Sequence, residues 1–266
     1  MRIYDQGNGP PLIVIPGVQG RWEWFTPAFE ALKSRCRIIS YSLAGDVGSG
    51  RRLDPALGFE NYLRQLDDVF EKTGLTRAAV CGISYGGLIA VRYAACRTDR
   101  VAALVIASSP GPGWKPDPVQ AGYIAHPWRQ APRFIATAPS RVWPEILAAC
   151  GPDRALRFLA RYGVRAAAAP MIPGLMAARI LETQAIDFST DCGTIRAPTL
   201  VISGEPALDR IVPVESTRRY VEMIPGARYV MLERTGHLGL VTRPEEWAAL
   251  VGRFVNEPDV ADLEVR

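Results

Sequence analysis

The residues best placed to do chemistry lie in the stretch Gly82-Ile83-Ser84-Tyr85-Gly86, which fits the pattern G-x-S-x-G. Apolar residues precede and follow it, so the pattern predicts a sharp turn from a strand into a helix. Such a turn holds the serine in a strained backbone conformation and exposes its hydroxyl at the carboxyl edge of a sheet. The first N–H groups of the new helix lack intrahelical partners and would face whatever the serine attacks. The alternative is a glycine-rich turn with an incidental serine, because short motifs also match by chance.

Two further groups follow strands in the way that this chemistry requires. In a parallel α/β sheet, ligands bind beyond the carboxyl ends of the strands. An acid, Asp209, follows one expected strand, and one of the two histidines, His237, follows the last. The order Ser84, Asp209, His237 is the order expected for this kind of elbow. We therefore expect a serine, an acid and a histidine at one sheet edge.

Short apolar runs predict the strands that place these groups. We expect strands at 12–15, 37–43, 78–83, 101–107, 198–204 and 227–232. Helical spacing or capping residues predict helices at 24–33, 59–73, 88–96, 214–223 and 245–255. The strands are continuously apolar rather than alternating, as a parallel sheet covered on both faces requires. The fold class is therefore α/β.

The alternation of strands and helices breaks after the fourth strand. Residues 111–195 contain no clear strand, and helical patterns occur at 131–137, 143–150, 153–162 and 173–185. The segment is rich in aromatic and apolar residues, which is typical of a helical insertion. We predict a core from residues 1–110 and 196–266, with a helical cap from residues 111–195.

These motifs together resemble the α/β-hydrolase superfamily. The resemblance is carried by the elbow at Ser84, the strand-then-glycine loop at Gly17, the segment from Gly204 to Pro213, the triplet Gly236-His237-Leu238, and the helical insertion. It covers nearly the whole chain. It implies a mostly parallel central sheet with helices on both faces and a helical cap inserted between two strands.

The resemblance also implies a role for each group. His237 would take the proton of Ser84 and later protonate the leaving group. Asp209 would hold the imidazole in the correct tautomer and stabilise its charged form. The backbone N–H groups of Val18 and Tyr85 would bind the oxyanion, and one such donor is typically worth ~10²–10³ in rate.

The sequence departs from the family pattern in two places. Pro16 precedes Gly17 where the family often has histidine, although the expected donor is a backbone N–H beyond the glycine. Asp209 lies two residues further from Gly204 than expected, which leaves Glu205 open as an alternative acid. We expect Asp187 and Asp191 to be helix caps or solvated charges.

Aromatic and sulfur-containing residues near the first loop and in the cap are candidates for the substrate pocket. The candidates are Trp22, Trp24, His126, Trp128, Trp143 and Met176. The alternative for each is packing within or under the cap, and for His126 simple solvation. The ring of Tyr85 could also face the substrate, whereas Cys81 is expected to be a small core residue.

Composition restricts the partners. The net charge is only +4 and the arginines are scattered, so no nucleic-acid surface is expected. The five cysteines include no C-x-x-C pair, so we expect neither a zinc site nor a disulfide framework, and no cofactor. The start of the chain lacks the apolar core of a signal peptide, and no membrane span is expected, which favours a cytoplasmic location. Oligomeric state stays open.

Three functions fit this resemblance. The first is a serine carboxylesterase that forms an acyl-enzyme intermediate on a small to medium apolar ester. The second uses the same triad to cleave a C–C bond of a β-diketone or ring-fission product, with Arg129, Arg133 and Arg179 as candidate polar groups. The third is a non-catalytic ligand-binding protein on the same fold. A serine at the elbow argues against epoxide hydrolases and haloalkane dehalogenases, which use aspartate there.

Overall fold

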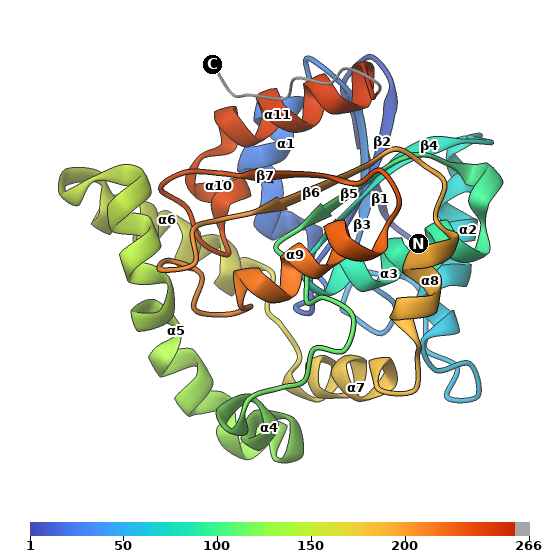
Figure 1. Ribbon diagram of the computed structural model, residues 1–266. Coiled ribbons are helices and arrows are strands. Elements are labelled where there is room, and N and C mark those ends of the chain that lie inside the picture. The colour runs from blue at the N-terminus through green and yellow to red at the C-terminus, as the bar shows by residue number, and fades with distance from the viewer. Residues whose placement is uncertain (259–266) are drawn as a thin grey trace.

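A single mixed sheet organises residues 1–258, the part of the chain that the computed structural model describes (Figure 1). Its strand order is β1-β3-β2-β4-β5-β6-β7, and only β1 runs antiparallel to its neighbour. The strands are β1 (Ile3–Gln6), β2 (Pro11–Ile15), β3 (Arg37–Tyr41), β4 (Ala78–Ile83), β5 (Val101–Ala107), β6 (Thr199–Ser203) and β7 (Arg228–Met231). The end of the predicted core, residues 259–266, lies outside the described residues.

Helices cover both faces of this sheet. The helices of the described chain are α1 (Thr26–Leu32), α2 (Glu60–Thr73), α3 (Tyr85–Cys96), α4 (Pro118–Ala125), α5 (Pro127–Cys150), α6 (Pro152–Ala168), α7 (Pro173–Thr183), α8 (Phe188–Thr194), α9 (Val214–Met223), α10 (Gly239–Thr242) and α11 (Pro244–Asn256). Short 3-10 helices occupy 22–25 and 98–100. Helices α2, α3, α8 and α9 contribute to one buried cluster, and α1, α10 and α11 contribute to the other.

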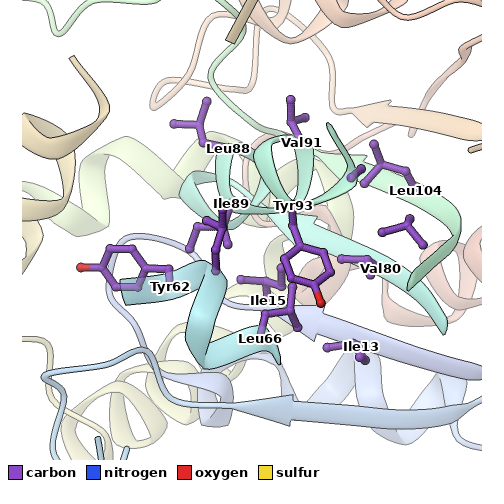
Figure 2. Close-up of a cluster of buried hydrophobic side chains, with 14 of the residues drawn as sticks. Ile13, Ile15, Tyr62, Leu66, Val80, Leu88, Ile89, Val91, Tyr93 and Leu104 are labelled. Carbon is purple, nitrogen blue, oxygen red and sulfur yellow. The ribbon is translucent and has the colours of Figure 1, made fainter. Parts of the chain in front are cut away.

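The side chains of each strand alternate between these two clusters. Along β2, Ile13 and Ile15 pack under α2 and α3 (Figure 2). Leu12 and Val14 pack on the other face, toward α1 and α11. All four are fully buried. A strand buried on both faces is apolar at nearly every position, which explains the apolar runs. A buried polar residue such as Ser40 is hydrogen-bonded, here to the carbonyl oxygen of Val14. The predicted α/β class and mostly parallel sheet are confirmed.

Several element boundaries also match the prediction. Helix α2 ends at Thr73, and Gly74 adopts the left-handed conformation (φ 67°) that glycine tolerates at a helix end. The antiparallel strand β1 and the short helix α10 were not predicted. Both have only four residues, too few to establish a periodic pattern.

The helical insertion lies between β5 and β6, and α4 to α7 group together at one end of the core (Figure 1). Helix α8 packs against α3 and α9, so it adds to the core although residues 111–195 were all predicted as cap.

Helix α5 runs unbroken for 24 residues through Pro132, Pro139 and Pro144, so the prediction of two separate helices there was wrong. Each proline leaves a carbonyl four residues earlier without its donor. Those carbonyls belong to residues 128, 135 and 140, which are exposed, so water can supply the missing hydrogen bonds.

Among residues 1–258, no single helix is long and apolar enough to cross a membrane. The two helices α6 and α7, which meet at a bend, would together be long and apolar enough, judged by length and composition only.

Candidate active site

Ser84 occupies the turn between β4 and α3 with φ 53° and ψ −122°, a backbone conformation that few residues other than glycine adopt. The glycines of the motif make this turn possible. A Cβ atom on Gly82 would lie 2.3 Å from the carbonyl oxygen of Gly86. A Cβ atom on Gly86 would lie 2.4 Å from the carbonyl oxygen of Ile15 on the neighbouring strand. The pattern thus reflects how closely strand, helix and first loop approach one another.

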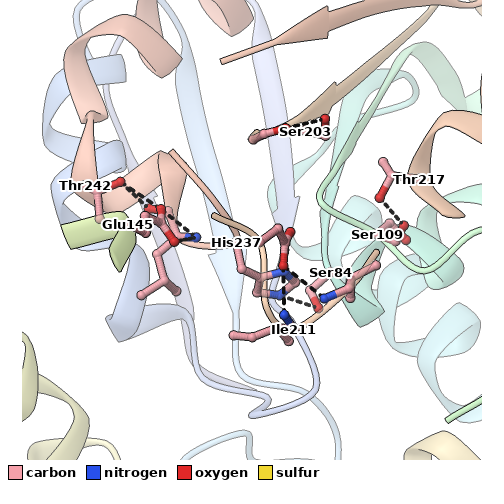
Figure 3. A network of polar contacts seen from close by, with 12 residues as sticks. Ser84, Ser109, Glu145, Ser203, Ile211, Thr217, His237 and Thr242 are labelled. Atoms are coloured by element: carbon pink, nitrogen blue, oxygen red, sulfur yellow. Dashed lines mark hydrogen bonds and ion pairs between the residues drawn. The ribbon is translucent and has the colours of Figure 1, made fainter. Parts of the chain in front are cut away.

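The structure brings Ser84, His237 and Asp209 together at the carboxyl edge of the sheet (Figure 3). Nε2 of His237 lies 3.1 Å from Oγ of Ser84, and Nδ1 lies 3.2 Å from Oδ2 of Asp209. With the proton on Nδ1, the ring donates to the carboxylate and accepts the serine hydroxyl. This arrangement can remove a proton from Ser84 and return it to a leaving group.

The Asp209 carboxylate is held by the loop that carries it. Its Oδ1 accepts hydrogen bonds from the N–H groups of Ile211 and Val212, both at 3.0 Å. The side chain is only 1% exposed, which leaves Oδ2 facing the imidazole. Glu205 points elsewhere, because its carboxylate accepts the N–H of Arg234 at 2.6 Å. Of the two acids left open by the sequence, Asp209 is the one that reaches His237.

The electrostatic setting of His237 favours the charged ring. Burial of the imidazole lowers its pKa, but attraction to Asp209, the hydrogen bond to that carboxylate and the charge of Glu145 together raise the pKa above its ordinary value. The imidazolium that forms when Ser84 is deprotonated is therefore stabilised.

Both expected oxyanion donors belong to residues that line a cavity over Ser84. Tyr85 is the first residue of α3, so its N–H has no acceptor within the helix. The first loop passes close to Ser84, since a Cβ atom on Gly17 would lie 3.3 Å from Cβ of Ser84. The chain from 1 to 258 has no cis peptide bond, so Pro16 enters this loop in the trans form.

A buried ion pair from the cap holds the same loop. Arg179 of α7 donates to the carbonyl oxygen of Val18 at 2.8 Å and forms an ion pair with Asp46. Both charged side chains are fully buried. Arg179, a candidate polar group for a substrate, is therefore occupied by the protein itself.

The cavity over Ser84 has a volume of about 210 Å³ and is mostly apolar. Apart from Tyr85, whose ring packs inside the core, the lining residues whose side chains carry polar atoms are Ser84, Trp114, Gln120, Tyr123 and Gln130. Among the described residues, no charged side chain lines it. Arg129 and Arg133 are exposed on α5 and do not contribute.

The residues that line the cavity differ from most of the residues predicted for the substrate pocket. Met176 lines the cavity, but Trp22, Trp24, His126, Trp128 and Trp143 do not. Trp22 packs on Tyr4 and Phe29, and the Trp24 indole donates to the carbonyl of Ala169. His126 is exposed, Trp128 is 67% exposed, and Trp143 is partly buried elsewhere on α5. The ring of Tyr85 packs against Phe59 and Tyr62.

Helical spacing identifies the cavity residues that the prediction missed. The lining positions are 120, 123 and 124 on α4, 127, 130, 131, 134 and 135 on α5, and 173, 176, 177 and 180 on α7. Those on α5 and on α7 follow the i, i+3, i+4, i+7 pattern of one helix face. The prediction selected large aromatic residues instead of tracing this face.

Known proteins of similar sequence and structure share this fold over nearly their whole length. A protein that carries the name of a carbamate hydrolase, RutD of Caulobacter sp. (strain K31), is 28% identical and is matched over 96% of each chain. The 2-hydroxymuconate semialdehyde hydrolase of Pseudomonas putida is 26% identical, with 97% of this chain and 91% of that one covered. The enol-lactonase of Burkholderia xenovorans LB400 superposes with a TM-score of 0.79 at 22% identity, over 96% of each chain. The structural likeness at this identity establishes the fold alone.

A sequence model described as the alpha/beta hydrolase family matches residues 12–250. With the family's elbow and the insertion between β5 and β6, this match shows that the chain belongs to the alpha/beta hydrolase family.

Proposed function

We propose that the protein is a serine hydrolase of carboxylic esters whose acyl or alcohol part is apolar. Ser84 is the nucleophile, His237 the base and then the acid, and Asp209 the group that orients the imidazole. The hydrogen bonds from Ser84 through His237 to Asp209 support these roles. The protein has no need of a cofactor for this chemistry.

The reaction follows from the geometry. His237 Nε2 accepts the Ser84 proton while Oγ attacks the ester carbonyl. The N–H groups of Val18 and Tyr85 stabilise the oxyanion. Collapse of this intermediate expels the alcohol, which takes the proton from His237 and leaves an acyl-enzyme. Water then attacks the acyl group with His237 again as base, which releases the acid and restores Ser84.

The absence of charge along the described cavity wall is the observation that favours an apolar ester. 2-Hydroxymuconate semialdehyde, the compound in the name of one relative, carries a carboxylate, and burial of a carboxylate without a cationic partner is costly. Arg129 and Arg133 lie outside the cavity, and Arg179 is paired with Asp46. C–C cleavage of such a compound therefore has less support than ester hydrolysis.

The test compares substrate classes on one enzyme. p-Nitrophenyl esters from acetate to decanoate should be hydrolysed with kcat/KM rising about fourfold per methylene until the cavity is full, because each buried CH₂ contributes ~0.8 kcal/mol. Ser84→Ala should abolish turnover, and Ser140→Ala, a change of an exposed serine on α5, should leave it unchanged.

Parallel assays on a ring-fission dienoate and a simple carbamate distinguish the other reactions named for relatives. A higher kcat/KM on either compound than on every ester would overturn the proposal. Failure of a fluorophosphonate probe to label Ser84, together with ligand binding but no turnover, would favour a non-catalytic binding protein.

A further inference from the structure

The cap places a buried carboxylate against the loop that carries His237. Glu145 of α5 is only 1% exposed. Its Oε1 and Oε2 both accept the N–H of Leu238 at 3.0 Å, and Oε1 also accepts the Thr242 hydroxyl at 3.0 Å (Figure 3). Leu238 directly follows His237 and precedes the first residue of α10. Leu238 has no side-chain oxygen to cap α10, and Glu145 instead accepts hydrogen bonds at both ends of this short helix, from the N–H of Leu238 and from the hydroxyl of Thr242.

Burial of an ionised carboxylate costs free energy unless its charge is paired. A buried carboxylate normally has a cationic partner. Within residues 1–258, no lysine or arginine forms an ion pair with Glu145. The cation that its charge can meet is the imidazolium of His237, which is coupled to it electrostatically. A glutamine at this position could accept the same N–H. The property that only glutamate supplies is its negative charge.

From this geometry we infer that Glu145 is a positioning residue. Through it, the position of the cap helix α5 affects the position of the catalytic base, His237. Glu145 accepts hydrogen bonds from the loop next to His237 and adds a second negative charge, after that of Asp209, which acts on the imidazolium. The inference rests on the hydrolase function proposed above.

The same helix also forms part of the cavity wall. Phe134 of α5 lines the cavity, and Glu145 lies eleven residues further along, about 16 Å at the rise of an α-helix. One continuous helix therefore carries both the cavity residue Phe134 and Glu145, with Pro139 and Pro144 between them. This helix contacts the cavity through Phe134 and the loop that carries His237 through Glu145.

The other titratable groups near this pair stay neutral around neutral pH. Asp209 and Glu145 are the charges that act on His237, and Cys150 and Tyr162 are the further groups coupled to Glu145. Burial raises the pKa of both the Cys150 thiol and the Tyr162 hydroxyl. Burial also raises the pKa of Glu145 itself, against hydrogen bonds from the loop and the attraction of His237.

The first experiment measures the His237 pKa directly. The chain has only two histidines, and His126 is exposed, so His126→Gln leaves a single imidazole signal for NMR titration. Adding Glu145→Gln should lower the His237 pKa by about 0.5 or more, because an opposite charge is lost. Asp191→Asn removes another buried carboxylate, paired with Arg92, and should leave the pKa unchanged. An unchanged pKa in Glu145→Gln would overturn the inference.

The second experiment measures hydrolysis of the best ester. Glu145→Gln should lower kcat about tenfold, leave KM within about twofold and move the acid limb of the pH profile downward. These expectations follow from a loss of about 1.4 kcal/mol in the transition state alone. Glu145→Asp keeps the charge and should retain the wild-type limb. Equal losses in Asp191→Asn would indicate general destabilisation and refute a specific role.

The two measurements separate this inference from the proposed function. A wild type without esterase activity would refute the function, whereas the NMR titration would still test Glu145. If Glu145→Gln does not fold, Thr242→Val removes one donor to the carboxylate and should lower kcat about threefold with KM unchanged. A Thr242→Val enzyme with wild-type kcat would then count against the inference.

Discussion

Replacement of Asp209 by asparagine should inactivate the enzyme through the tautomer of His237. Oδ1 of Asp209 faces two backbone N–H donors, those of Ile211 and Val212. Asparagine would keep its carbonyl oxygen at this position, because turning its NH₂ toward them would leave buried donors unsatisfied. The NH₂ group would then face Nδ1 of His237. That nitrogen would have to accept, which moves the ring proton to Nε2, and the ring could no longer accept the Ser84 proton.

The size of the effect follows from these hydrogen bonds. To restore the active tautomer, the amide must flip and leave both backbone donors without an acceptor. Each unsatisfied buried donor costs about 1–3 kcal/mol, so the flip costs roughly 4 kcal/mol. This corresponds to a loss of about 10³ in kcat, and the lost charge of Asp209 adds to it. Asp209→Asn, although nearly isosteric, should therefore be at least as damaging as Asp209→Ala, which places no donor against Nδ1.

The assay combines ester hydrolysis with ¹⁵N NMR of the imidazole. Asp209→Asn should lose about 10³–10⁴ in kcat and show His237 with its proton on Nε2. Glu205→Gln changes the other acid of the same loop, which contacts Arg234, and should stay within about threefold of wild type. A variant Asp209→Asn that retains more than about a tenth of the wild-type kcat would refute the orientation argument.

Three other predictions concern the pKa of His237, the ion pair of Arg179 with Asp46, and the tight turn at Gly82. Because activity needs the neutral imidazole and the pKa of His237 is raised, kcat/KM should fall as pH decreases, with a midpoint above the ordinary value of about 6.5; a midpoint below it would contradict the electrostatics. Arg179→Met leaves Asp46 buried without its cation and should lower the free energy of unfolding in urea by about 3–5 kcal/mol; equal stability would show that the pair contributes little. Gly82→Ala forces a Cβ against the helix and should reduce activity at least about a hundredfold, whereas Gly122→Ala, with open space around it, should not.

Local patterns were sufficient to predict most strands of the core and the turn that carries Ser84. Apolar runs predicted six of the strands in the described sheet, because a strand buried on both faces has few polar positions. The glycines around Ser84 predicted the turn, because only glycine lets strand and helix approach so closely. His237 followed from its place after the last strand, since the carboxyl ends of parallel strands share one edge. These features depend on residues near one another in the chain.

Other features needed contacts between distant segments. Asp209 and Glu205 both follow β6, and only the path of the loop decides which of them reaches His237. The helical spacing of the cavity face was present in the sequence, but the seating of the cap decides that this face, and not Trp128, lies over Ser84.

Glu145 illustrates the limit most clearly. A glutamate in an arginine-rich helix is most often a surface charge, and nothing near it in the chain indicates otherwise. Only the packing of α5 against the α10 turn buries it and brings it to Leu238, 93 residues away. The strand and elbow patterns arise from local backbone sterics and burial, which the sequence encodes directly. The partner of a buried charge is decided by which surfaces pack together, and that is a property of the whole fold.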